Sequence, residues 1–164
     1  AQIVPDKDVD GLTLEGQKFF LPATVEGVFQ IMSTRNHQFE GKVAAVVGSE
    51  GEIGIPLCRE LEKAGFRRII KVDTKLADSD ITRDLLTADY VFSATGVRAL
   101  VKAEYLKTGV IVFDIGLGDI DPSVYEIAAE YTPMIGGCGP NTVVALMRNV
   151  VKSFINRMEA IYRI

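Results

Sequence analysis

The chain has 164 residues, of which 48% are hydrophobic and 24% charged, and its formal net charge is -4. This length and composition predict a soluble globular protein with one core, and the acidic balance excludes the basic face of a nucleic-acid-binding or acidic-membrane-binding protein. No apolar stretch approaches the roughly 18 residues that span a bilayer, and no signal peptide is visible.

The first 41 residues are predicted to form an opening segment and one short helix that are continuous with the domain that follows. The run Pro5-Asp-Lys-Asp-Val-Asp-Gly11 is polar and rich in turn-forming residues. The helix is expected over Val25–Met32, with Thr24 as its N-cap residue.

The linker at residues 33–41 contains the single histidine, His37, among polar neighbours. We expect its ring to be solvated, so a catalytic histidine is not expected. Cys58 and Cys138 fit no metal-ligand spacing and are expected to be free thiols of a cytoplasmic protein. The sequence therefore predicts neither a metal site nor a catalytic side chain.

From residue 42 to residue 164, short apolar runs alternate with helical patterns. Strands are expected at Val43–Val47, Arg68–Val72, Tyr90–Ser93 and Val110–Phe113. Helices are expected at Ile53–Ala64, Ile81–Leu86, Ala103–Leu106, Tyr125–Glu130 and Thr142–Tyr162. The alternation predicts an α/β fold, a Rossmann-like doubly wound parallel sheet in a single dinucleotide-binding domain.

The strongest functional pattern runs from Lys42 to Asp73. The first strand ends in Gly48-Ser49-Glu50, glycine recurs at Gly51 and Gly54 before the helix, and the second strand ends at Asp73. Glycines permit a tight turn and a close ligand, and a helix N-terminus offers free N–H groups to a phosphate. An acid at the end of the second strand is typical of ribose binding. A bare turn would explain the glycines, and a solvated turn would explain Asp73, but their order predicts nucleotide binding.

Small residues also follow two later strands, at Thr95-Gly96 and at Asp114-Ile115-Gly116. The carboxyl ends of parallel strands meet at one edge of a sheet, where ligands of such folds bind. Together with Gly48, these segments predict an open edge for a flat ligand.

Four segments resemble the methylenetetrahydrofolate dehydrogenase/cyclohydrolase family. They are Pro5–Gly11, Val47-Gly48 through Gly54-Ile-Pro56, Phe113-Asp-Ile-Gly116, and Thr132-Pro133 through Gly136-Gly-Cys-Gly-Pro-Asn-Thr142. The resemblance covers the family's cofactor-binding half. No segment corresponds to the catalytic N-terminal domain with its Tyr-x-x-x-Lys motif, so that domain is expected to be absent.

The resemblance implies a set of cofactor-binding residues. The pyrophosphate and ribose side would be lined by Gly48, Ser49, Glu50, Ile53 and Gly54, with Asp73 on the ribose. The adenosine or bridging ribose would lie over Thr95 and Gly96, and the nicotinamide near Ile115, Leu117 and Thr142.

The resemblance also implies contacts with a folate-type substrate. Asp10 matches an aspartate that contacts folate in the family, although a structural role in a turn explains it equally well. Gly136 and Gly137 match backbone close to the pterin and the nicotinamide. Ile135 and Asn141 stand where the family usually has Pro and Met, beside the same loop.

The predicted cofactor is NAD, with NADP less favoured. NADP-using members of the family usually have Gly-Arg-Ser where this chain has Gly48-Ser49-Glu50, and their arginine helps to neutralise the 2′-phosphate. Carboxylates at Glu50, Glu52 and Asp73 would repel that phosphate, whereas a carboxylate accepts hydrogen bonds from a ribose diol.

The resemblance thus implies an NAD-linked module that transfers a hydride from 5,10-methylenetetrahydrofolate, with little or no cyclohydrolase activity. A non-catalytic dinucleotide-binding or interaction module is the alternative. The Gly-Gly-x-Gly-Pro motif argues against a third possibility, an amino-acid or polyol dehydrogenase. The last helix has apolar residues on more than one side, among them Val143, Val150 and Ile155. This predicts a homodimer, or cover from the missing N-terminal domain.

Overall fold

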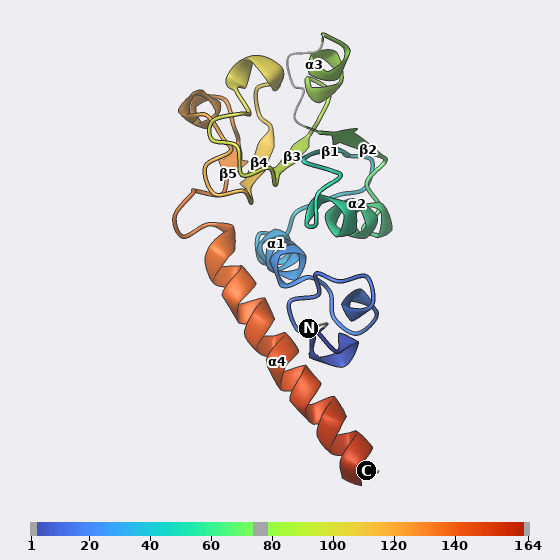
Figure 1. Cartoon of the computed structure of the whole chain (residues 1–164). Helices are drawn as coiled ribbons and strands as arrows, with labels where there is room; N and C mark the ends of the chain where they lie inside the picture. Colours follow the sequence, from blue (N-terminus) through green and yellow to red (C-terminus); the bar gives the residue numbers. More distant parts are fainter. Residues whose placement is uncertain (1–2, 74–78, 163–164) are drawn as a thin grey trace.

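The apolar runs of the sequence form one sheet of five parallel strands, in the order β2-β1-β3-β4-β5, in a computed structural model that describes residues 3–73 and 79–162 (Figure 1). The strands are β1 Val43–Val47, β2 Arg68–Val72, β3 Tyr90–Ser93, β4 Ile111–Asp114 and β5 Glu130–Tyr131. The helices are α1 Ala23–Thr34, α2 Gly54–Lys63, α3 Ser79–Leu85 and α4 Cys138–Tyr162, and 3₁₀ turns lie at Pro5–Lys7, Gly16–Lys18, Ala103–Tyr105 and Pro122–Glu126. The predicted α/β, doubly wound parallel sheet is confirmed.

Both faces of the sheet are covered, which explains the unbroken apolar run of β1. Its five residues are all buried, with Ala44 and Val46 in the core under α1 and α2, and Ala45 and Val47 in a second core on the opposite face. Figure 1 shows α1 and α2 on one side of the sheet and α3 on the other. Strands buried on both faces have no alternation of polar and apolar residues.

Helix α1 begins earlier than predicted, at Ala23, and its N-cap residue is Pro22. The Pro22 carbonyl accepts a hydrogen bond from the Glu26 N–H at 2.9 Å, and the Ala23 N–H donates to the Asp10 carbonyl at 3.1 Å. The prediction of Thr24 as the N-cap residue was therefore wrong. The opening segment instead supplies a backbone acceptor for the N–H of the first helical residue.

The predicted helix at 125–130 is also wrong. A 3₁₀ turn ends at Glu126, and Glu130 and Tyr131 form the edge strand β5, in register with Ile111 and Val112 of β4. This pairing joins residues that are distant in sequence, so the local pattern of a short segment does not reveal it.

The linker histidine is buried rather than solvated, which corrects another prediction. The His37 side chain is only 4% exposed. Its Nδ1 lies 3.1 Å from the Tyr90 hydroxyl, and its ring packs edge-on against Tyr90 and Phe113. Phe39, two residues on, also packs against the core. Alternate residues of the linker therefore face inward, as they do in an extended segment.

Replacing His37 by alanine should lower the free energy of unfolding by about 2 kcal/mol, because it removes a buried hydrogen bond and buried ring contacts. Urea unfolding followed by circular dichroism measures this change. The exposed neighbour Gln38 is the matched control, and Gln38→Ala should change stability by less than about 0.5 kcal/mol. Equal losses in the two variants would contradict the buried position of the ring.

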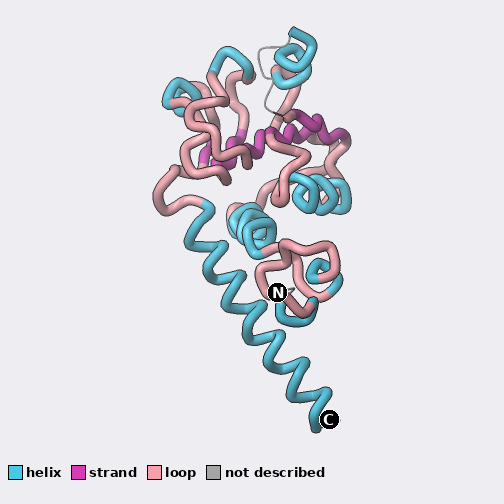
Figure 2. Tube along the Cα trace, in the orientation of Figure 1, coloured by secondary structure: helices cyan, strands magenta, loops and turns pink. Residues whose placement is uncertain are grey.

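Helix α4 crosses α1 and then extends beyond the rest of the molecule (Figure 2). The crossing is close because Gly27 has no side chain, and a Cβ there would lie 2.8 Å from the Thr142 nitrogen. Asn149 Nδ2 donates to the Val9 and Leu21 carbonyls at 2.8 and 3.1 Å, which ties the opening segment to α4. Among the described helices, none is long and apolar enough to cross a membrane. Many apolar side chains of α4 are exposed, and the homodimer stays a prediction.

Candidate functional site

The strand order reverses between β1 and β3, and ligands of open α/β sheets bind at such a point, beyond the carboxyl ends of the strands. Gly48 follows β1 and Thr95 closely follows β3. A Cβ placed on Gly48 would lie 2.7 Å from the Ala94 carbonyl oxygen and 3.1 Å from Thr95 Cγ2. The two predicted segments are therefore brought into contact. We use the name switch-point crevice for the ligand position that the fold predicts beyond these strand ends.

The turn after β1 is as tight as its glycines suggest. Gly48 has a φ of 85°, in the left-handed region. Its N–H and that of Ser49 both donate to the Val72 carbonyl, at 2.8 and 3.1 Å. A Cβ at Gly54 would overlap the Gly48 carbonyl oxygen, so only glycine lets α2 begin this close to the turn.

The N-terminus of α2 has donors that no backbone acceptor in the described part of the chain uses. The N–H groups of Ile53 and Gly54 have no backbone acceptor among the described residues. Free N–H groups and the helix dipole favour an anion at this position. The glycine cradle and these donors fit the pyrophosphate of a dinucleotide, and Gly48, Ser49, Ile53 and Gly54 are the residues that could hold it.

Three exposed carboxylates lie on the two segments that the sequence predicts to bind the pyrophosphate and the ribose. Glu50, Glu52 and Asp73 are all exposed, and Asp73 directly follows β2 beside the turn. The basic side chains of β2 are engaged elsewhere, because Lys71 pairs with Glu62 at 2.9 Å and Arg68 pairs with Asp84 at 2.6 Å.

The ends of β3 and β4 are joined by a side chain that the sequence analysis did not single out. Asp119 is fully buried, and its Oδ2 accepts hydrogen bonds from the Ser93 hydroxyl at 2.7 Å and from the Thr95 N–H and hydroxyl at 2.7 and 2.8 Å. Gly96, with a φ of 68°, continues the β3 end. The Asp-x-Gly-x-Gly-Asp pattern at residues 114–119 could have drawn attention to Asp119. The pattern does not show that Asp119 contacts the end of β3.

The β4 end has two of the predicted nicotinamide-side residues. Ile115 is half-buried, while Leu117 is exposed and has a φ of 62°. Burial raises the pKa of Asp114, and the charge of Asp119 raises it further. Hydrogen bonds from the Gly118 and Asp119 N–H groups lower the same pKa but do not cancel the rise. The β4 end is therefore a loop folded around two buried carboxylates.

The remaining predicted residues belong to other segments of the chain. Gly136 and Gly137 belong to the turn between β5 and α4, and Thr142, in the first turns of α4, donates its hydroxyl to the Cys138 carbonyl at 3.1 Å. Asp10 lies in the opening segment, and no hydrogen bond or ion pair among the described residues joins its side chain to the crevice. In the same residues, no cluster of three or more His, Cys, Asp or Glu could hold a metal ion.

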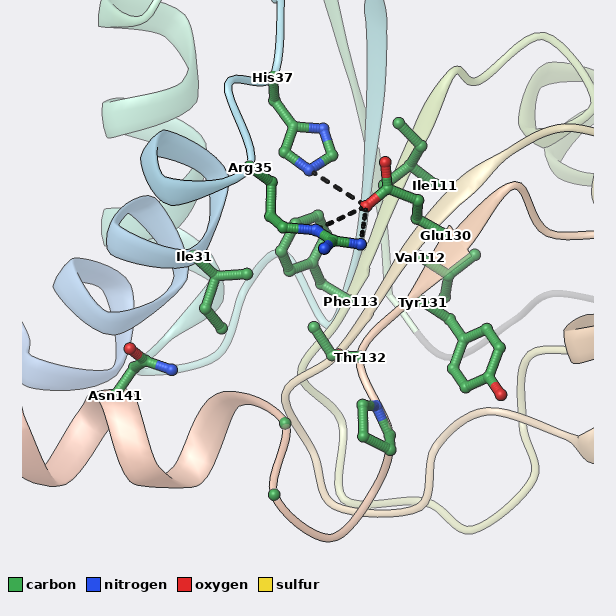
Figure 3. A pocket seen from close by; sticks show the side chains of 13 residues that line it. Ile31, Arg35, His37, Ile111, Val112, Phe113, Glu130, Tyr131, Thr132 and Asn141 are labelled. Atoms are coloured by element: carbon green, nitrogen blue, oxygen red, sulfur yellow. Dashed lines mark hydrogen bonds and ion pairs between the residues drawn. The ribbon is translucent and has the colours of Figure 1, made fainter.

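A separate cavity of about 230 Å³ lies between α1, the β4–β5 edge and the start of α4 (Figure 3). Glu130 Oε2 is 2.9 Å from Arg35 Nη2 and 3.8 Å from His37 Nε2 at its mouth. Gly136 and Gly137 line it from the side of their turn. Its charges are paired, and it is distinct from the switch-point crevice.

Both cysteines are free thiols, as predicted, and both are buried. Burial raises the pKa of Cys138 to about 11, and it also raises the pKa of Cys58. At about pH 8 only about a thousandth of Cys138 would be thiolate, so the native chain should react with a disulfide reagent far more slowly than the unfolded chain. Absorbance of the released thiolate measures both rates, and equal rates would contradict the burial.

Comparison with known proteins agrees with this geometry. Residues 22–158 match the family model described as tetrahydrofolate dehydrogenase/cyclohydrolase, NAD(P)-binding domain. The chain is 33% identical to the bifunctional protein FolD of Clostridium tetani, over 93% of this chain and 60% of that protein. It is 34% identical to the cytoplasmic C-1-tetrahydrofolate synthase of Schizosaccharomyces pombe, over 93% of this chain and 19% of that protein.

Solved structures show the same fold. The FolD methylenetetrahydrofolate dehydrogenase/cyclohydrolase of Campylobacter jejuni superposes with a TM-score of 0.83 at 32% identity, covering 94% of this chain and 60% of that chain. The Trypanosoma brucei enzyme, complexed with NADP cofactor and an inhibitor, superposes with a TM-score of 0.81 at 28% identity, covering 95% and 61%. The chain thus spans about three fifths of these bacterial and trypanosomal relatives. It belongs to the tetrahydrofolate dehydrogenase/cyclohydrolase family, in the NAD(P)-binding domain.

Proposed function

We propose that this chain binds a dinucleotide in the switch-point crevice and forms the cofactor-binding part of a 5,10-methylenetetrahydrofolate dehydrogenase. The observation that carries the proposal is the turn from Gly48 to Gly54, where a closely packed glycine pair and unused N–H groups meet at the strand-order reversal. Family membership supports the same ligand. The folate substrate is proposed from the Asp10 segment and from the Gly136-Gly137 turn.

When bound, the cofactor would supply a nicotinamide that accepts a hydride from the methylene carbon of the folate. The chain's part is to bind and orient, since hydride transfer between two held carbons needs no protein acid or base. Little cyclohydrolase activity is expected, because that reaction needs proton handling. The buried carboxylates Asp114 and Asp119 are already engaged by N–H and hydroxyl donors.

We further propose that NAD is preferred to NADP. The exposed carboxylates Glu50, Glu52 and Asp73 would be unfavourable beside a 2′-phosphate and favourable beside a ribose diol. Family membership supports NADP at least as well as NAD, since the structure of the Trypanosoma brucei relative was solved with NADP. The preference for NAD therefore rests on these three side chains and on Ser49, which stands where NADP-using members usually have arginine.

Calorimetric titration of the chain with NAD and, separately, with NADP tests the proposal. Tight NAD binding with weak NADP binding is expected. Equal affinities would overturn the preference while leaving the site in place, and binding of neither cofactor would overturn the site itself. Oxidation of 5,10-methylenetetrahydrofolate by the NAD-loaded chain, followed at the nicotinamide absorbance, would favour the dehydrogenase over the non-catalytic dinucleotide-binding module.

A further inference from the structure

We infer that Asp119 is a positioning residue that holds the β3 and β4 ends in the arrangement that receives the cofactor, an inference that rests on the proposed function. The Asp119 carboxylate is fully buried. Its Oδ2 accepts three hydrogen bonds from the β3 end, from the Ser93 hydroxyl, the Thr95 N–H and the Thr95 hydroxyl, at 2.7 to 2.8 Å. Hydrogen bonds to an ionised acceptor are about twice as strong as neutral ones.

The backbone conformation of the loop after β4 places the Asp119 carboxylate next to the β3 end. Leu117 and Gly118 have φ values of 62° and 112°, which turn the chain back toward β3. The Asp114 carboxylate accepts the Gly118 N–H at 2.8 Å and the Asp119 N–H at 3.3 Å. Gly116 leaves the necessary room, because a Cβ there would overlap both carboxylate oxygens of Asp119. A non-glycine residue with a positive φ is uncommon and costly, so this loop is conformationally specified.

Backbone bonds extend the connection beyond one side chain. The Ala99 N–H donates to the Gly118 carbonyl at 2.8 Å, and the Val101 N–H donates to the Asp119 carbonyl at 3.0 Å. The segment after β3 and the loop after β4 are therefore one unit. Thr95 and Gly96, which are proposed to lie under the sugar, belong to it. So do Ile115 and Leu117, two of the three residues proposed near the nicotinamide.

The other carboxylate oxygen of Asp119 suggests that its contacts with the β3 end serve a function as well as the fold. Asp119 Oδ1 is buried and has no hydrogen-bond partner among the described residues. A buried polar atom without a partner is unfavourable and needs a reason. The reason that we infer is that Asp119 fixes the conformation of Thr95 in which the cofactor binds. If that conformation became less populated, the apparent dissociation constant of the cofactor would rise.

The test compares two buried carboxylates that each accept three hydrogen bonds. Asp8 is also buried, accepts the Gly11 N–H together with the N–H and hydroxyl of Thr13, and sits in a space that a Cβ at Gly16 would fill. It lies in the opening segment. Asp119→Asn and Asp8→Asn are therefore expected to lose similar amounts of stability in urea unfolding, while only one of them alters the proposed site.

NADH fluorescence titration of the folded chains, checked by circular dichroism, separates the two roles. The dissociation constant should rise at least about tenfold for Asp119→Asn and by less than about twofold for Asp8→Asn, because only the former depopulates the competent Thr95 conformer. If Asp119→Asn fails to fold, Ser93→Ala removes one of the three donors and should raise the constant about threefold.

The outcomes distinguish this inference from the proposed function. If the wild-type chain binds NADH and Asp119→Asn binds it with the same affinity, the role of Asp119 is overturned while the proposed function stands. Unchanged affinity in Ser93→Ala has the same meaning when Asp119→Asn does not fold. Equal losses of affinity in the Asp119 and Asp8 variants would overturn it as well, since a general loss of stability would then explain both. Failure of the wild-type chain to bind NADH would overturn the proposed function and this inference together.

Discussion

Gly54→Ala should destabilise the chain by about 2–4 kcal/mol and abolish dinucleotide binding, the largest single effect that we expect. The added Cβ would overlap the Gly48 carbonyl oxygen and approach Ser49 Cα to 2.7 Å. These are backbone atoms at the end of a buried strand, so they cannot rotate away as a flexible side chain could. The α2 N-terminus must shift outward, and its free N–H groups would leave the crevice.

Urea unfolding gives the stability, and NADH titration of the folded fraction gives the binding. Gly139→Ala is the matched control, because a Cβ at Gly139 in the first turn of α4 would meet nothing within 4 Å. It should leave stability within about 0.5 kcal/mol of the wild type, or raise it slightly. Wild-type stability in Gly54→Ala would contradict the close packing of the turn.

Asp73→Asn should weaken NAD binding about tenfold to a hundredfold and should leave NADP binding unchanged or improved. Each charge-assisted hydrogen bond to a ribose hydroxyl contributes about 1.5–3 kcal/mol, and the same charge repels a 2′-phosphate. Asp73 is exposed at the end of β2. Substitution should therefore cost little stability, and the change in affinity can be attributed to the site.

Calorimetry with each cofactor measures the two changes. Glu159→Gln removes the same charge from an exposed position on α4 and should alter neither affinity by more than about twofold, apart from weak long-range effects that salt screens. An Asp73→Asn variant with wild-type affinity for NAD would show that another group binds the ribose.

The positions of three of the strands could be predicted closely from their apolar residues. The bounds of β1, β2 and β3 agree with the prediction residue for residue, since short runs rich in apolar residues between turn residues leave little choice of position. The β5 strand could not be found this way. It has two residues, and only its pairing with Ile111 and Val112 of β4 makes it a strand.

The start of α4 shows how a local rule can mislead. Gly139 and Pro140 suggest a loop, so the helix was predicted from Thr142, yet it begins at Cys138. Proline is tolerated in the first turn of a helix, because its missing N–H would have no intrahelical partner there. The glycine and proline therefore belong to the helix start rather than to the preceding turn.

The candidate site was predictable where it lies within one βαβ unit, as at Gly48, Gly54 and Asp73. It was not predictable where it depends on contacts across the sheet. Asp119 meets Thr95 only because β3 and β4 are neighbours, and the His37 ring is buried by aromatic residues of those same strands. Side-chain contacts of this kind follow from strand order, which a local pattern does not contain.

The most direct test of the proposed site is an amide NMR titration of the ¹⁵N-labelled chain with NAD. We expect the largest shifts at Gly48–Gly54, at Asp73, and at the β3 and β4 ends around Thr95 and Ile115, with little change along the exposed part of α4. Shifts centred on the cavity beside Arg35 and Glu130, or no shifts at a saturating concentration, would contradict binding in the switch-point crevice.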